Sequence, residues 1–233
     1  VGGRCRVVLV FPARPDPDAL TAAVVRVAAA TSITPPDVDI QPLPDTDWVA
    51  EGLKGLDRVV VGRFSLRGGH LPPDPVPGRI EFVVEAAQAF GTGHHATTAG
   101  CLDALGRLAK RRRFARPLDM GCGSGVLAMA MARMWRARVT AVDVDPLSVA
   151  ATRANARLNG LGPWVRADTG NGYATPLARR NAPYDLVVAN ILAGPLAAMA
   201  PALAHVLAPV GVSVLSGLLD DQEAWVRAAH VAQ

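Results

Sequence analysis

The residues best suited to chemistry lie in one stretch of the chain, from Leu118 to Asp143. It has an apolar approach, the loop Gly121-Cys122-Gly123-Ser124-Gly125, an apolar helical run, and the segment Val139-Thr140-Ala141-Val142-Asp143. Glycines at alternate positions, with an acidic residue 18 positions after the last of them, are typical of a strand–loop–helix–strand unit. Such glycines let the turn approach a ligand closely, and a carboxylate at the tip of the second strand can accept hydrogen bonds from two ribose hydroxyls. The stretch therefore predicts a site for a nucleotide-like ligand.

The spacing of the glycines distinguishes two kinds of nucleotide ligand. Dinucleotide-binding loops have the pattern G-x-G-x-x-G, in which a helix N-terminus faces a pyrophosphate. This chain has G-x-G-x-G, preceded by Asp119. That spacing disfavours a nicotinamide dehydrogenase and is similar to motif I of the S-adenosylmethionine-dependent methyltransferases, whose ligand carries no phosphate. A glycine-rich turn without any ligand is the alternative interpretation of the loop taken alone.

The pattern of apolar segments around this loop predicts a doubly wound parallel α/β sheet. Strands are expected at 80–85, 118–120, 138–143, 164–167, 185–190 and 211–217, and helices at 98–109, 124–134, 146–158, 195–207 and 220–229. Ligands of such sheets lie beyond the carboxyl ends of the strands. The loop at 121–125, Asp143 and Asn190 all follow expected strands, so they are expected to form one site.

The first 45 residues are expected to form a partial N-terminal domain. Residues 4–11 and 38–43 are expected to be strands, and 17–30 a helix with Asp16 as its cap and Pro17 at its first position. A β-α-β piece of this size buries little core by itself, so it is interpreted as half of a larger module or as a lid. Residues 46–79 are expected to be a short helix and a linker rich in proline and glycine, and residues 80–233 the ligand-binding domain.

Composition limits the class of protein. The 233 residues have room for one full domain and a smaller one, and half of them are apolar without any run of 18, so no transmembrane helix is expected. Three cysteines without C-x-x-C spacing indicate neither a disulfide framework nor a zinc site, which fits a reducing cytoplasm. The net charge of +4 permits a partner rich in RNA but does not argue for one. Because the chain lacks an initiator Met and a signal-peptide layout, it is expected to be a fragment or a processed product.

Two further polar segments precede the glycine loop. The segment 89–98 contains His94 and His95, but adjacent side chains diverge and no third ligand follows at helical spacing, so no metal site is expected. Its hydroxyls and amides are interpreted as facing the ligand. Lys110-Arg111-Arg112-Arg113 and Arg116 form a basic cluster, interpreted as a solvated helix C-terminus, with contact to nucleic acid as the alternative.

Six stretches taken together are more specific than the glycine loop alone. In chain order they are 89–98 (AFGTGHHATT), 118–125 (LDMGCGSG), 142–146 (VDVDP), 155–160 (NARLNG), 189–196 (ANILAGPL) and 216–222 (SGLLDDQ). This series resembles the PrmA family of bacterial methyltransferases that modify the large-subunit ribosomal protein L-eleven, from about Asp47 to the end of the chain. The resemblance implies a Rossmann-like class I methyltransferase sheet with a ferredoxin-like N-terminal domain, here only in part.

The resemblance also implies a function. The chain is expected to be a cytoplasmic, monomeric enzyme that transfers methyl groups from S-adenosylmethionine to lysine side chains, or to the N-terminal amine, of the ribosomal protein, free or ribosome-bound. Neither a membrane nor a direct nucleic-acid substrate is implied. Two alternatives stay open: a methyltransferase for another protein or a small molecule, and a truncated, non-catalytic module that binds the cofactor. The acceptor residues, the number of methyl groups and a general base are not marked in the sequence.

The family's site residues are carried over to matching positions of this chain. Thr98 would approach the cofactor from the loop before a helix, Gly121 (with Gly123 of the same loop) would lie against its methionine part, and Asp143 would hold its ribose. Asn190 would lie between the cofactor and the target amine, as the catalytic residue. A cap for the helix expected from Pro195 is the alternative role of Asn190, which lies five residues early for it.

Three departures from the family pattern stand out. His94-His95-Ala96 replaces the commoner Thr-His-Pro, so no role is assigned to the two histidines. Residues 1–45 match only the second half of the N-terminal domain, and the final β-hairpin is missing after Gln233. The sheet is therefore expected to lack its last two strands.

Overall fold

The computed structural model describes Phe11 and residues 14–41, 58–85 and 95–233. The chain divides into two compact units, Val1–Trp48 and Val49–Gln233. The strand expected at 4–11, apart from Phe11, the helix expected after Asp45, and His94 with the loop before it lie outside the described residues.

The first unit contains one described helix, α1 (Pro17–Ala30), at the expected position. Asp16 caps it, because its Oδ1 accepts hydrogen bonds from the backbone N–H groups of Asp18 at 3.0 Å and Ala19 at 3.4 Å. The strand expected at 38–43 is wrong for its described part, since residues 38–41 have no strand conformation. A strand is stable only where a neighbouring strand accepts and donates its backbone hydrogen bonds, and the described residues supply none here.

The second unit is built on a parallel five-stranded sheet, which confirms the predicted fold class. Its strand order is β6-β5-β4-β7-β8, and every pairing is parallel. The strands are β4 (Pro117–Met120), β5 (Val139–Asp143), β6 (Val165–Thr169), β7 (Tyr184–Asn190) and β8 (Leu207–Ser216). The reversal of strand order between β4 and β7 is the type of point where ligands bind in doubly wound sheets.

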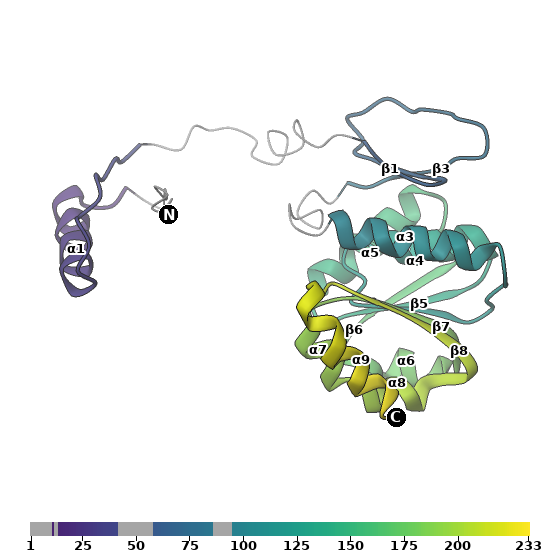
Figure 1. Cartoon of the computed structure of the whole chain (residues 1–233). Helices are drawn as coiled ribbons and strands as arrows, with labels where there is room; N and C mark the ends of the chain where they lie inside the picture. The colour runs from purple at the N-terminus through teal and green to yellow at the C-terminus, as the bar shows by residue number, and fades with distance from the viewer. Residues whose placement is uncertain (1–10, 12–13, 42–57, 86–94) are drawn as a thin grey trace. The chain divides into compact units, whose positions relative to one another are not determined.

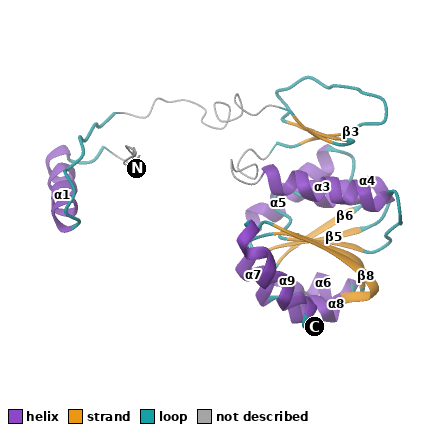
Figure 2. Ribbon diagram, in the orientation of Figure 1, coloured by secondary structure: helices purple, strands orange, loops and turns teal. Residues whose placement is uncertain are grey.

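Helices cover both faces of this sheet (Figures 1 and 2). One face carries α3 (His95–Ala109), α4 (Val126–Trp135) and α5 (Pro146–Leu158). The other carries α6 (Pro176–Asn181), α7 (Ala193–Ala198), α8 (Ala200–Val206) and α9 (Glu223–Val231), with the short 3₁₀ turns η2 (Gly172–Ala174) and η3 (Asp220–Gln222). None of the helices in the described part of the chain is long and apolar enough to cross a bilayer.

A second, smaller sheet covers the outer side of α3 and α4. Its strands are β1 (Val59–Val61), β2 (Phe64–Arg67) and β3 (Ile80–Val83); β1 pairs antiparallel with β2, and β2 parallel with β3. The rings of Phe64 and Phe82 stack with centroids 6.5 Å apart and belong to the same buried cluster as Leu102 of α3. The sequence reading missed β1 and β2, which lie in the range expected to be helix and linker. They are instead part of the second unit.

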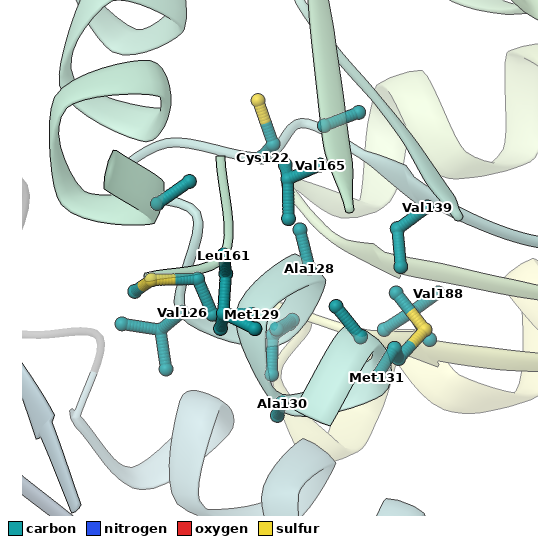
Figure 3. Close-up of a cluster of buried hydrophobic side chains, with 14 of the residues drawn as sticks. Cys122, Val126, Ala128, Met129, Ala130, Met131, Val139, Leu161, Val165 and Val188 are labelled. Carbon is teal, nitrogen blue, oxygen red and sulfur yellow. The ribbon is translucent and has the colours of Figure 1, made fainter. Parts of the chain in front are cut away.

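Helix α4 is buried along most of its surface because it lies between the two sheets. Eight of its residues are buried, and Figure 3 shows Ala128, Met129 and Met131 among strand residues such as Val139 and Val188. A helix that is apolar all round is stable only in such a position. The loop at 121–125 is therefore held between a buried strand and a buried helix.

The helix expected at 195–207 is two helices, α7 and α8. Pro201 lies in the first turn of α8 and has no N–H to continue α7, so the chain bends at Met199. Strand β8 then begins at Leu207, four residues earlier than expected, and the short helix α6 was not predicted at all.

Candidate functional site

The strand register brings the glycine loop, Asp143 and Asn190 together. Met120 of β4 pairs with Val142 of β5 on one side and with Ala189 of β7 on the other. The next residue of each strand is Gly121, Asp143 or Asn190, so the three lie side by side at the carboxyl edge of the sheet. The three residues that were expected to form one site are therefore neighbours in the structure.

Asp143 is held in place by two backbone groups. Its Oδ2 accepts a hydrogen bond from Gly123 N at 2.9 Å, and its Oδ1 accepts one from Asp145 N at 3.0 Å. A carboxylate oxygen has two acceptor sites, so each still has one to offer. Asp143 is thus rigidly oriented and able to accept two further hydroxyl groups.

The three glycines of the loop are required for different reasons. All have φ between +51° and +80°, where residues with a side chain are strained. A Cβ at Gly121 would overlap the side chain of Ile191, and one at Gly125 would lie 2.9 Å from Thr152. A Cβ at Gly123 would meet no atom within 4 Å. Among the three, Gly123 is therefore the position where the loop borders open space that a ligand could enter.

Asn190 contacts Thr98, another of the residues carried over from the family. Its Nδ2 donates to Thr98 Oγ1 at 3.1 Å, while its Oδ1 is buried and has no hydrogen-bond partner among the described residues. A buried acceptor left without a partner costs about 1–3 kcal/mol. A ligand N–H group placed against Oδ1 would remove that cost.

The placement of Thr98 in a loop before a helix is wrong. Helix α3 begins at His95, three residues earlier than expected, so Thr98 lies in its first turn. The alternative role of Asn190, as a helix cap, also fails. Helix α7 begins at Ala193 with Leu192 at the cap position and without a side-chain cap.

Asp119 is a buried carboxyl at the same edge, and the sequence reading gave it no role. Its Oδ2 accepts a hydrogen bond from Ala128 N at 2.8 Å. This bond caps α4, because Gly125 at the cap position has no side chain to do so. Its Oδ1 has no partner among the described residues. Burial raises the pKa of Asp119 to about 7, against the lowering effect of the Ala128 N–H and with a smaller rise from the charge of Asp143. An acidic residue at the end of an apolar strand is a signal that could have marked it.

Replacing Asp119 by asparagine is expected to change how stability depends on pH. The unfolded pKa is about 3.9, so between about pH 4 and pH 7 the folded chain keeps a proton that the unfolded chain has lost. The stability contributed by this proton is complete below about pH 4, falls with rising pH and is lost above about pH 7. The total fall in the free energy of unfolding is up to about 4 kcal/mol. The difference in free energy of unfolding between Asp119→Asn and the parent, measured by urea unfolding, should therefore shift in favour of the variant by at least about 1 kcal/mol from pH 5 to pH 8.

Asp103→Asn is the control for this experiment, because that carboxylate is exposed on α3. The control should track the parent across the same pH range. An Asp119→Asn variant whose difference from the parent is the same at pH 5 and pH 8 would contradict a proton on this carboxyl.

Two asparagines of the stretch 155–160 form hydrogen bonds with neighbouring segments, Asn155 with the glycine loop and both with the end of β3. Asn155 donates to Ser124 O at 2.9 Å and accepts from Glu85 N at 3.1 Å. Asn159 accepts from Val83 N at 2.9 Å and donates to Val83 O at 2.7 Å. The two side chains connect α5 to the end of β3 and to the glycine loop, a role that sequence reasoning did not assign.

Comparison with known proteins places this chain in a family. A family model described as "Ribosomal protein L11 methyltransferase (PrmA)" matches residues 4–233. A ribosomal protein L11 methyltransferase of Mesorhizobium japonicum is 43% identical over 218 residues, which are 94% of this chain and 75% of that protein. One of Chelativorans sp. is 44% identical over 197 residues, covering 84% and 68%.

A solved structure agrees with these relatives. The crystal structure of the ribosomal protein L11 methylase of Lactobacillus delbrueckii subsp. bulgaricus superposes with a TM-score of 0.68 at 26% identity, over 76% of this chain and 88% of that one. The resemblance read from six short stretches is thereby confirmed over most of the chain. The chain belongs to the ribosomal protein L11 methyltransferase (PrmA) family.

Proposed function

We propose that this chain transfers methyl groups from S-adenosylmethionine to amines of the large-subunit ribosomal protein that its relatives are named for. The acceptors are lysine side chains or the N-terminal amine. The observation that carries the proposal is the buried, unpartnered Oδ1 of Asn190, at the edge of the sheet beside Gly121 and Asp143. Membership of the family supports the choice of substrate.

The residues of this edge fit the proposed cofactor. Asp143 has two free acceptor sites for the ribose hydroxyls, and the backbone at Gly123 borders open space. Gly121 would lie beside the methionine part, and Thr98 would orient Asn190 through the bond to its amide. Bound S-adenosylmethionine would supply an electrophilic methyl group: the lone pair of a neutral amine would attack its carbon in line, the C–S bond would break, and S-adenosylhomocysteine would leave.

The protein's task in this reaction is to present a neutral, oriented amine. A lysine with a pKa near 10.4 must lose its proton, at a cost of about 4–5 kcal/mol at pH 7. Asn190 Oδ1 would accept an N–H from the amine and aim its lone pair at the methyl group. Positioning of this kind contributes up to about 7–11 kcal/mol in favourable cases. Because an amide oxygen is a poor nucleophile, it does not compete for the methyl group.

The remaining assignments follow the same proposal. Residues 1–45 select the protein substrate, and the second unit binds the cofactor, since every proposed cofactor residue lies after Asp47. The enzyme acts as a cytoplasmic monomer on the free or ribosome-bound protein, with no membrane and no nucleic acid as substrate.

The chain is expected to bind S-adenosylmethionine and its demethylated product, but not NAD. Asp143→Ala should weaken binding of the cofactor by roughly 1.5–3 kcal/mol, the range for hydrogen bonds to a charged group. Isothermal titration measures both dissociation constants. Asp103→Ala is the matched control, an exposed carboxylate on α3, and should bind like the parent.

Tight binding of NAD without binding of S-adenosylmethionine would overturn the cofactor assignment, and an unchanged constant for Asp143→Ala would remove this residue from the site. Methyl transfer itself is tested with radiolabelled S-adenosylmethionine and the purified ribosomal protein. A parent chain that binds the cofactor but labels nothing would favour the non-catalytic module.

A further inference from the structure

A pocket opens at the edge of the main sheet opposite to the proposed methyl-transfer site. Its volume is about 390 Å³, and its lining includes Arg113, Phe114, Trp135, Arg136, Arg138 and Trp164. These residues come from the segments that lead into β4, β5 and β6, three neighbouring strands. The pocket therefore lies at the amino ends of the strands, with the length of the sheet between it and Asp143.

The arginines of the pocket are not paired with acidic side chains of the described residues. The side chains of Arg113, Arg136 and Arg138 are exposed and have no ion pair or hydrogen bond with any described residue. The only acidic residue between positions 105 and 142 is Asp119, which is buried. Asp185 lies beside the pocket, where its carboxylate accepts from the backbone N–H groups of Ala115 and Arg116 and forms no ion pair with an arginine of the pocket. Three guanidinium groups thus face solvent around one pocket.

The aromatic residues of the pocket provide flat, fixed surfaces. Trp164 is 37% exposed, and the backbone oxygen of Trp164 accepts from Val139 N at 2.8 Å, which fixes its place beside β5. Trp135 is 5% exposed and packs edge-on against Phe114, with ring centroids 4.9 Å apart. Its indole N–H is buried and has no acceptor among the described residues. A ligand with a planar ring, an acceptor atom and negative charge would satisfy all three features.

We propose that this pocket binds a nucleotide within a single strand of RNA. The arginines would pair with phosphate groups, since a guanidinium matches phosphate geometry, and the exposed face of Trp164 would stack on a base. The strand would continue along the basic residues next to the pocket, Lys110, Arg111, Arg112 and Arg116. Of these, Arg112 already donates a hydrogen bond to Val210 O at 2.7 Å, and its guanidinium lies over the ring of Phe114.

Two observations favour an RNA strand over other anions. The basic residues extend beyond the pocket, so they can bind phosphates spaced along a strand, whereas the phosphates of a free nucleotide are adjacent to one another. An acidic peptide would match the arginines but would leave the Trp164 face without a stacking partner. The choice of RNA over DNA rests on the proposed function, because a ribosomal protein is assembled on RNA. The contact is for docking, not for chemistry.

The probe is a fluorescein-labelled oligouridine of about 12 nucleotides, measured by fluorescence anisotropy between 50 and 200 mM salt. The double variant Arg113→Ala/Arg138→Ala is expected to bind at least about tenfold more weakly. Its slope of log K against log salt should become less negative by about 1.4, which is two phosphate contacts at about 0.7 each for a single strand. Trp164→Ala should weaken binding about fivefold to 150-fold, the range for one stacked base.

The matched control is Arg180→Ala/Arg227→Ala, which removes the same charge from exposed positions on α6 and α9, at the other face of the sheet. It should bind RNA within about twofold of the parent. All variants should bind S-adenosylmethionine like the parent, and this readout separates failure of the RNA site from failure of the proposed function. Absence of RNA binding by the parent at 50 mM salt, or equal losses in control and pocket variants, would overturn the proposal. Tighter binding of a 12-residue oligoglutamate or of oligothymidine than of oligouridine would also overturn it.

Discussion

Asn190→Ala is expected to lower the rate of methyl transfer at least about a hundredfold, the scale of losing one positioned group at a reacting centre. The residue ends β7 after four buried residues (Leu186, Val187, Val188 and Ala189), so it is held by a rigid element. Its Nδ2 is fixed by Thr98, which leaves Oδ1 free to accept from the target amine. Alanine removes that acceptor without disturbing the strand.

Single-turnover methylation of the ribosomal protein at saturating S-adenosylmethionine is the measurement. Cofactor affinity should fall much less than the rate, by about the worth of one hydrogen bond. Asn171→Ala, an exposed asparagine after β6 without a side-chain cap bond, is the control and should react like the parent. Thr98→Val should slow the reaction and Thr98→Ser restore it, because the hydroxyl orients the amide. An Asn190→Ala variant as fast as the parent would leave this residue a structural part only.

Deletion of residues 1–45 is expected to abolish methylation of the ribosomal protein while cofactor affinity stays within about threefold. The deleted segment lies in the first unit, and the proposed cofactor residues all lie in the second. Both buried clusters of the second unit are built from residues between Phe64 and Val226, so its core stays complete without the first 45 residues. Acceptor choice and cofactor binding should therefore separate.

The shortened chain is compared with the full chain by isothermal titration and by labelling of the ribosomal protein. Its urea midpoint is measured as well, to show that the second unit is folded. Labelling that survives the deletion at the parental rate would show that residues 1–45 do not select the substrate. A loss of cofactor binding in a folded chain would place part of the cofactor site in the first unit.

Local patterns in the sequence determined most of the sheet and the edge at which the site lies. Helix α1 was predictable because Asp16 and Pro17 are an N-terminal signal that acts on neighbouring backbone groups. The strands before Gly121, Asp143 and Asn190 were predictable because each is an apolar run that ends in a glycine or polar residue. Parallel strands place such ends at one edge, so the position of Gly121, Asp143 and Asn190 at that edge followed from the order of the strands alone.

The elements that sequence reasoning missed depend on distant partners. Strands β1 and β2 are three and four residues long, and the valines 59–61 with the turn at Gly62 are a weak local signal. They exist because β2 pairs with β3 across the loop 68–79 and because Phe64 is buried in the cluster that contains Leu102. A pattern of a few residues cannot show such burial.

The detailed geometry of the site was decided by the tertiary structure. Asn190 meets Thr98, 92 positions away, and Asn155 meets Glu85, 70 positions away. The glycines at 121–125 were read as one ligand-binding loop, yet a Cβ at Gly121 would overlap Ile191, and only at Gly123 of the three would a Cβ point into open space. Sequence spacing determines which backbone can form, because those constraints act within a few residues. Which atoms are left buried, paired or open depends on side chains that folding brings together from distant parts of the chain.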